Sequence, residues 1–460
     1  MQENEAPGGP RGSFLGHVNI VMATYAIDGL LAFASGVLVA RALGTDGRGA
    51  YSLFVVSTAL GQMLLGVGAG NAAVYYINKH ELTPRDVVSA VHVITLASLV
   101  VTAVAVAAVV PWMGADVIGG GVSAWLLVAA VPALIYWATL CVVLQAMSRF
   151  VAMGLATIAQ PFVLLIFVAV AYAAGRPSAS DVVGFWIISN VAGAAVAIAC
   201  IGAANFDVAV IARPAWTQIR MLAHFGVQGE AGNMLQLLNY RMDQYVVRGF
   251  VGLAGVGIYA VGVSVSEAVW LLANSVAIVL LPRLTSASEE DVRWMTPVAC
   301  RNTMLVAAGG AVVLGVAAPI AVPVLFGHKF DDSVQALWWL LPGTVALTGS
   351  KVLTSYIFSQ GRPLVNTAIT CVSLVVTVVA LLLLVPPFGV NGAAAASSLA
   401  YGAHLCAALF AYGRISGSEP WRAVVPHPSD VRLYADGARD VLARITRRQP
   451  FGEPTPRAGG

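Results

Sequence analysis

The chain has 460 residues, of which 58% are hydrophobic and 10% are charged, and its mean hydropathy is +0.82. This composition excludes a soluble globular domain, because apolar stretches of about 20 residues, the length that spans a bilayer, recur along the whole chain. The net charge of +3 comes largely from the C-terminal tail and gives no support for nucleic-acid binding. We therefore expect an all-α integral membrane protein.

The apolar stretches and the residues that interrupt them predict about 12 transmembrane helices. We expect a cytoplasmic N-terminus at 1–16, a first lobe of six helices at 17–204 and a cytoplasmic connector at 205–222. A second lobe of six helices follows at 223–413, and a cytoplasmic tail at 414–460. The twelve expected spans are 17–40, 50–77, 87–110, 122–146, 150–174, 182–203, 224–250, 256–281, 298–325, 333–359, 363–386 and 391–413.

The tail alternates apolar residues and arginines at helical spacing over 430–446, which predicts an interfacial helix. The Pro- and Gly-rich end at 450–460 has no periodicity, so we expect it to be disordered. The five cysteines are scattered singly in apolar segments, and neither they nor the histidines have metal-ligand spacing. We expect no metal site, no catalytic residues and no bound cofactor.

One glycine motif occurs in both lobes with the same spacing. Gly44, Gly47, Gly49 and Tyr51 are spaced as Gly252, Gly255, Gly257 and Tyr259 are. Six helical segments separate the two copies, so both halves enter the membrane in the same sense. The motif therefore predicts two lobes related by a parallel pseudo-two-fold repeat, which is typical of transporters.

Lys and Arg are distributed unequally between the two sides of the membrane that twelve spans create. We count 18 on the side that holds both termini and 5 on the other side, among 25 in total. Eight of the 18 lie in the tail, but the remaining loops favour the same side. By the positive-inside rule both termini should be cytoplasmic.

The seventh segment carries an unusual polar load for a membrane span. Its polar residues lie on an arc of about 200° at ~100° per residue, and Leu235, Leu238 and Met242 lie on the other face. An ionised residue at the bilayer centre costs at least ~2.5 kcal/mol, so Arg241 should not face lipid. The polar residues of the segment are Glu230, Asn233, Gln236, Asn239, Tyr240, Arg241, Asp243, Gln244 and Arg248.

Two interpretations of these intramembrane charges stay open. They can form buried ion pairs, for which Arg241 with Glu267 and Lys351 with Asp243 are the candidates. Alternatively, basic groups line a central cavity that neutralises an anion, and carboxylates bind a coupling ion. On the second interpretation the substrate-binding residues are Arg241, Arg41, Arg48, Arg248, Lys351, Asn233 and Gln244. The coupling-ion candidates are Asp243, Glu230, Glu267 and Asp28.

Motifs along nearly the whole chain resemble the bacterial polysaccharide, or oligosaccharidyl-lipid, flippases. This family belongs to the superfamily that also contains multidrug extruders and lipid II flippases. The order and spacing of the motifs carry the likeness. They are Ala40–Gly44 with Gly49–Tyr51, Asn239–Asp243 with Gly257–Ala260, Leu280–Leu284, Phe326–Gly327 with Leu340–Gly343, and the turns Gly361–Pro363 and Pro387–Ala394.

The resemblance implies two lobes that rock about a cationic central cavity and move a polyprenyl-pyrophosphate-linked oligosaccharide from the inner to the outer leaflet of a bacterial inner membrane. It also implies proton or sodium coupling, membrane lipids as partners, and a polysaccharide polymerase and glycosyltransferases as functional partners of a monomeric protein. Two alternatives stay open: a multidrug antiporter of the same superfamily, and a polyprenyl-dependent membrane glycosyltransferase or polymerase.

Overall fold

The computed structural model describes residues 10–175, 177–202, 216–286 and 289–425, with side chains for all of these except 10–19 and 270–294. Every regular element in these ranges is helical. The elements are α1 (Pro10–Leu65), α2 (Ala69–Asn78), α3 (Pro84–Met113), α4 (Leu126–Ala146), α5 (Phe150–Ala174), α6 (Ala179–Ile201), α7 (Trp216–Phe250), α8 (Leu253–Ser286), α9 (Glu289–Phe326), η3 (His328–Phe330), α10 (Asp332–Ser359), α11 (Pro363–Ser416) and η4 (Pro420–Ala423).

Helices α1 and α11 each contain two membrane spans. They have 56 and 54 residues, about 80 Å at ~1.5 Å per residue, which is more than twice the ~30 Å hydrocarbon core. Each is kinked at a glycine with positive φ, Gly44 (φ 68°) in α1 and Gly389 (φ 57°) in α11. Only glycine adopts this backbone conformation without strain. Helices α1 and α11 each count as two spans, and α2 continues the second span of α1. The predicted all-α fold of about twelve spans is therefore confirmed.

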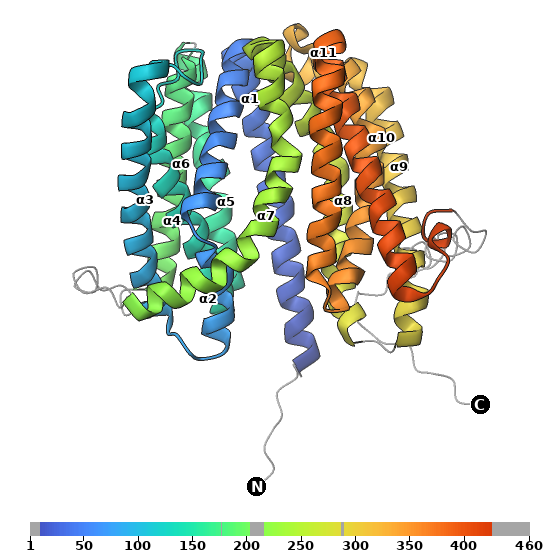
Figure 1. Cartoon of the computed structure of the whole chain (residues 1–460). Helices are drawn as coiled ribbons and strands as arrows, with labels where there is room; N and C mark the ends of the chain where they lie inside the picture. Colours follow the sequence, from blue (N-terminus) through green and yellow to red (C-terminus); the bar gives the residue numbers. More distant parts are fainter. Residues whose placement is uncertain (1–9, 176, 203–215, 287–288, 426–460) are drawn as a thin grey trace, which may run out of the picture.

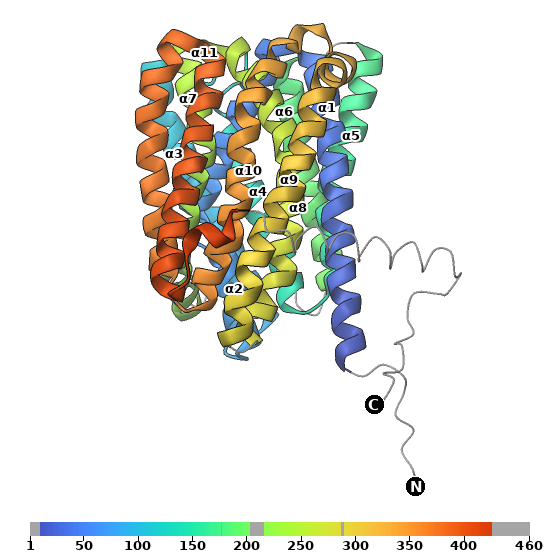
Figure 2. The same ribbon diagram turned by 90° about the vertical axis from the view of Figure 1, so that its right-hand side faces the viewer.

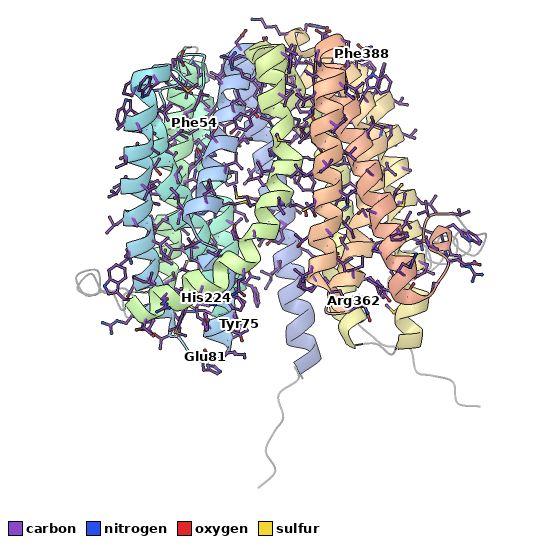
Figure 3. The ribbon with its side chains drawn as sticks, in the orientation of Figure 1. Phe54, Tyr75, Glu81, His224, Arg362 and Phe388 are labelled. Atoms are coloured by element: carbon purple, nitrogen blue, oxygen red, sulfur yellow. The ribbon has the colours of Figure 1, made fainter. Side chains whose placement is uncertain are left out.

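The helices form two lobes with α7 between them (Figure 1). The first lobe contains α1–α6 and the second contains α8–α11, and the second lobe is seen face-on when the molecule is turned by 90° (Figure 2). We call the end of the bundle that holds Gly44 and Gly389 the kink end. Phe388 marks the kink end in Figure 3, and Tyr75, Glu81 and Arg362 mark the opposite end.

The two copies of the glycine motif pack against each other at the kink end. A Cβ atom on Gly49 would lie 2.1 Å from the carbonyl oxygen of Leu253, and one on Gly257 would lie 2.0 Å from that of Thr45. The contact is reciprocal, because Thr45 and Leu253 hold equivalent positions in the repeat. The absence of side chains at these two glycines lets the second half of α1 and the start of α8 touch through their backbones.

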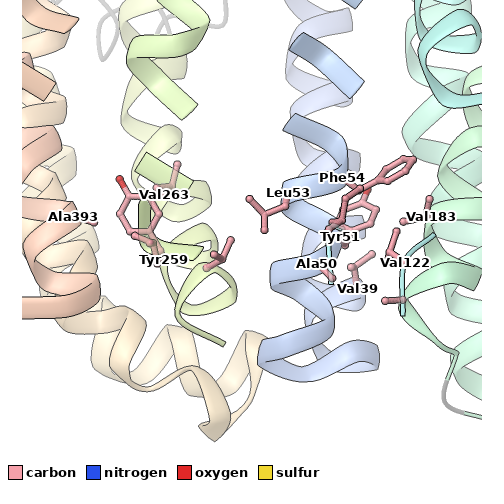
Figure 4. Close-up of a cluster of buried hydrophobic side chains, with 14 of the residues drawn as sticks. Val39, Ala50, Tyr51, Leu53, Phe54, Val122, Val183, Tyr259, Val263 and Ala393 are labelled. Carbon is pink, nitrogen blue, oxygen red and sulfur yellow. The ribbon is translucent and has the colours of Figure 1, made fainter. Parts of the chain in front are cut away.

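The hydrophobic cores differ between the two ends of the bundle. At the kink end one cluster contains Tyr51 and Phe54 of α1 together with Tyr259 and Val263 of α8, and so joins both lobes (Figure 4). Towards the opposite end the cores separate. One of them is built from α2–α6 and the first half of α7, and another is built from α9, α10, α11 and η4. The lobes are therefore packed together at the kink end.

One predicted span is interrupted in the structure. The expected helix at 50–77 is broken between Leu65 and Ala69, where Val67 (φ 45°) and Gly68 (φ 65°) have positive φ. The break lets this turn contact α7, because a Cβ atom on Gly226 would lie 2.1 Å from the carbonyl oxygen of Val67. Residues 216–222 of the expected connector belong to α7, and its other residues and the expected tail helix at 430–446 lie outside the described residues.

Candidate functional site

Helix α7 packs on the first lobe with its first half and on the second lobe with its second half. In the first half, Phe225 stacks on Tyr75 of α2 with ring centroids 4.3 Å apart, and Gln218 Nε2 donates to Asp86 Oδ1 of α3 at 2.9 Å. In the second half, Asn239 Nδ2 donates to Ser373 Oγ of α11 at 3.0 Å. The polar residues of α7 therefore lie at the boundary between the lobes.

Arg241 is paired with Glu267 of α8. Its Nη2 donates to Glu267 Oε1 at 2.8 Å, and the two side chains are 29% and 31% exposed. This is one of the two ion pairs that the sequence left open as an alternative to anion binding. A pair with this much exposure in the middle of the bundle is accessible to a further charged group, so the two interpretations do not exclude each other.

Two further cations lie near this pair. The Arg48 guanidinium of α1 is in electrostatic range of both Arg241 and Glu267, and Lys351 of α10 is in range of Glu267. Arg48 is only 8% exposed, and its Nε has no hydrogen-bond partner among the described residues. We call Arg48, Arg241, Glu267 and Lys351 the central charged cluster. It draws basic residues from both lobes, and their predicted role in binding an anionic substrate stays a prediction.

Asp243 follows Arg241 by two residues on α7, which is less than one helical turn from the central charged cluster. It is buried, with 2% of its surface exposed. Its carboxylate accepts hydrogen bonds from the Tyr259 hydroxyl, from Ser397 Oγ at 3.3 Å and from the Gln244 backbone N–H at 2.7 Å. The sequence did not single out Tyr259 or Ser397 for this role. The repeat indicated these two residues, because its two copies are 208 residues apart. At this spacing Tyr259 corresponds to Tyr51 and Ser397 corresponds to Ser189, and Tyr51 and Ser189 are also buried.

Gln244 connects the lobes. Its Oε1 accepts a hydrogen bond from Ser52 Oγ of α1 at 2.8 Å, and the next residue, Tyr245, shares one with Ser57 Oγ at 2.8 Å. In this conformation Gln244 is 2% exposed, so its side chain contributes to lobe contact. Its predicted role in substrate binding stays a prediction.

Glu230 and Asn233 lie nearer the opposite end. The Glu230 Oε2 atom accepts from Asn233 Nδ2 at 3.3 Å and from Asn71 Nδ2 of α2 at 3.4 Å, both longer than usual hydrogen bonds. Asp28 lies half-buried in the first half of α1, near Tyr25 and Cys141. The structure therefore distributes the four coupling-ion candidates over three places: Glu230, Asp28, and the neighbouring pair Asp243 and Glu267.

Arg41 of α1 and Arg248 of α7 lie at the kink end. Arg41 donates to the carbonyl oxygens of Val324 and of Leu325, the latter at 2.6 Å, and so binds the last turn of α9. The Arg248 guanidinium lies against the backbone of Gly119 in the first lobe. Arg41 and Lys329 also line a hollow of about 640 Å³ that includes Tyr172 and Ser178. The sequence did not single out Lys329.

Metal ligation has no support in the described part of the chain, where no three His, Cys, Asp or Glu side chains gather in a way that could hold a metal ion. The arrangement instead combines partly exposed cations, a buried hydrogen-bonded carboxylate and contacts between lobes.

The comparison with protein families decides the classification. The family described as "Polysaccharide biosynthesis protein" matches residues 38–335, more than half of the chain. The chain belongs to this family. The family membership that the sequence motifs predicted is thereby confirmed. Among curated proteins no match was found.

Solved structures share the fold at low sequence identity. The lipid II flippase MurJ in an inward closed conformation superposes with a TM-score of 0.69 and 14% identity, over 85% of this chain and 87% of that one. An inward-facing multidrug resistance MATE transporter of the MOP superfamily gives 0.64 and 15%, over 86% and 98%. A MOP superfamily transporter from Pyrococcus furiosus, with a binding pocket of reverse polarity, gives 0.57 and 15%, over 89% and 97%. The protein is a multi-pass membrane protein with the fold of MOP transporters.

Proposed function

We propose that this protein is a flippase that moves a polyprenyl-pyrophosphate-linked oligosaccharide from the inner to the outer leaflet of a bacterial cytoplasmic membrane, for cell-surface polysaccharide synthesis. The observation that carries the proposal is the central charged cluster. In it Arg48 of the first lobe lies in electrostatic range of Arg241 of α7 and of the carboxylate of Glu267, and Lys351 of the second lobe is in range of the same carboxylate.

The charges of the cluster favour an anionic cargo. Three basic side chains face Glu267, and if the buried Asp243 is also counted as ionised, one positive charge remains. Guanidinium groups bind phosphate oxygens with two parallel hydrogen bonds, so Arg48 and Arg241 are suited to a pyrophosphate. An entering pyrophosphate competes with Glu267 for Arg241. Binding of the cargo therefore weakens the ion pair between Arg241 and Glu267.

The direction of transport follows from the orientation. If the excess of Lys and Arg places both termini in the cytoplasm, the kink end faces the outer side. The shared core at the kink end then closes the outer side, and the cargo headgroup enters from the cytoplasmic side. Rocking of the lobes would break the contacts at the kink end while the lipid tail stays in the bilayer. No covalent bond is made or broken, so the protein is not an enzyme.

Coupling and partners are also part of the proposal. Proton or sodium coupling would use Asp243, Glu267, Glu230 or Asp28, and no tightly bound cofactor is required. A polysaccharide polymerase and glycosyltransferases would act before and after the flippase, which functions as a monomer among membrane lipids. Nucleic acid has no role.

The test is transbilayer movement of a labelled polyprenyl-pyrophosphoryl oligosaccharide in proteoliposomes, beside uptake of an organic cation by the same preparation. We expect flipping by the wild-type protein, its loss in Arg241→Ala, and no cation uptake. Cation uptake without flipping would replace the proposal with a multidrug antiporter. Extension of the lipid-linked sugar, detected by mass spectrometry, would replace it with a glycosyltransferase or polymerase.

A further inference from the structure

A polar pocket of about 370 Å³ lies inside the second lobe, between α7, α10 and both halves of α11. Its volume is within the range of small-molecule sites, about 300–1,000 Å³. We call it the C-lobe pocket. The residues that line it include Gln236, Lys351, Thr354, Ser355, Thr370 and His404.

The hydroxyl groups of this pocket present acceptor atoms. Thr354 donates its proton to the backbone oxygen of Ser350 at 3.0 Å, Ser355 donates to that of Lys351 at 2.8 Å, and Thr370 donates to that of Asn366 at 3.1 Å. A hydroxyl that donates to its own helix keeps its lone pairs for another donor. Three oxygens with acceptor capacity therefore line the pocket.

Asn366 adds a further acceptor atom, and His404 adds a ring nitrogen without a partner in the described part of the chain. Asn366 Nδ2 donates to the backbone oxygen of Thr354 at 3.0 Å, and its buried Oδ1 has no partner among the described residues. His404 is 3% exposed, and its Nδ1 is hydrogen-bonded to Ser350 Oγ. Its Nε2 is buried and has no partner in the described part of the chain. Buried polar atoms without partners are costly in proteins, so these two atoms indicate a missing ligand.

An acceptor-rich wall selects a ligand that donates hydrogen bonds. The hydroxyl and acetamido groups of a sugar ring supply such donors, whereas a phosphate or carboxylate would bring its lone pairs against those of the wall. Lys351 is the one cation that lines the pocket, and it also faces Glu267 of the central charged cluster. The pocket thus adjoins the place where the proposed function puts the pyrophosphate.

We propose that the C-lobe pocket is a saccharide subsite that holds a sugar of the cargo through its hydroxyl or acetamido donors, next to the pyrophosphate at the central charged cluster. This inference rests on the proposed function and adds the part of the cargo that the second lobe recognises.

The test compares two double variants that differ only in whether the removed hydroxyls line the pocket. Ser355→Ala with Thr370→Val removes two acceptor oxygens from the pocket. Ser359→Ala with Thr367→Val is the matched control on the same two helices. Those hydroxyls also donate to their own helices, at 2.7 Å to Tyr356 O and 3.4 Å to Pro363 O, but lie outside the pocket.

Equilibrium binding in detergent micelles is measured with two probes. One is the lipid-linked oligosaccharide purified from cells that produce this protein, and the other is sugar-free polyprenyl pyrophosphate. We expect the pocket variant to bind the sugar-bearing lipid about tenfold more weakly than wild type, as loss of two hydrogen bonds allows, and to bind the sugar-free lipid unchanged. The control variant should bind both probes as wild type does.

The outcomes separate the two proposals. The saccharide subsite is wrong if the pocket variant binds both probes as the control does, or if its affinity for both probes falls equally. In either case, flipping by the wild-type protein still supports the proposed function. If the wild-type protein binds neither probe, the proposed function fails and the subsite fails with it.

Discussion

Replacing Gly257 by alanine should separate the two lobes at the kink end. The new Cβ atom would lie 2.0 Å from the backbone oxygen of Thr45, and Cβ atoms essentially never approach other atoms more closely than 3.0 Å. The obstructing atom belongs to the backbone of the α1 kink, so no side-chain rotation relieves the clash. The lobes must move apart locally by about 1 Å, at the ~1–3 kcal/mol typical of an overpacked contact.

This cost falls only on the conformation that is closed at the kink end. Since each 1.4 kcal/mol changes an equilibrium tenfold, the closed population should fall by about 5- to 150-fold relative to an open one. The assay is the cross-linking rate of a cysteine pair at positions 52 and 244, in a background without the five native cysteines. Ser52 and Gln244 are hydrogen-bonded at 2.8 Å across the lobes in the closed conformation.

Two further variants make the test specific. Gly49→Ala should act as Gly257→Ala does, because its Cβ atom would lie 2.1 Å from the backbone oxygen of Leu253. Gly249→Ala is the control, because a Cβ atom there meets nothing within 4 Å. Cross-linking of Gly257→Ala at the rate of Gly249→Ala would refute the view that close backbone contact of the two motifs holds the kink end closed.

Four other substitutions test the remaining contacts. Glu267→Gln removes the carboxylate that competes for Arg241, so affinity for polyprenyl pyrophosphate should rise several-fold in a micelle binding assay; unchanged affinity would contradict that competition. Asp243→Asn places an amide among hydroxyl donors and should lower the free energy of unfolding by about 1–3 kcal/mol in thermal denaturation. If the pH dependence of transport is unchanged in this variant, the Asp243 carboxylate is excluded as the proton carrier. Gly226→Ala should destabilise by about 1–3 kcal/mol, because its Cβ atom would lie 2.1 Å from a backbone oxygen. Gly229→Ala, with nothing within 4 Å, should stabilise by about 0.5–1 kcal/mol; equal melting temperatures would contradict the asymmetry.

The membrane spans could be predicted because they depend on local properties of the chain. A span must satisfy its backbone hydrogen bonds within itself and present an apolar surface to lipid, so length and hydropathy are sufficient to find it. The two kinks were predictable as turns, since Gly44 and Gly389 stand where the chain must reverse. The break near Val67 was not predicted, although Gly66, Gly68 and Gly70 surround it, because glycine is also frequent inside membrane helices. The break is set by contact with Gly226 of α7.

The site was predicted as a set of residue types, and its partners were not. The sequence indicated that Arg241 should not face lipid and offered Glu267 as its candidate partner, but it left open whether Arg241 forms this pair or binds an anionic substrate. Tertiary packing assigns Glu267 to Arg241 and surrounds Asp243 with Tyr259 and Ser397. Arg41 shows the opposite case, since its side chain binds the end of α9, 283 residues further along the chain, which no local pattern reveals.

The sequence by itself determined the membrane class, the repeat, the number of spans and the presence of basic residues in the middle of the second lobe. Those features follow from hydropathy and spacing, which act over one helix or are repeated along the chain. Only the tertiary structure decided which lobe contacts close the kink end and which charges gather at the centre. It also decided which hydroxyls of α10 and α11 turn their acceptor atoms into one pocket. Pairing between distant helices depends on how whole surfaces pack, and a single sequence contains many equally plausible partners for each polar side chain.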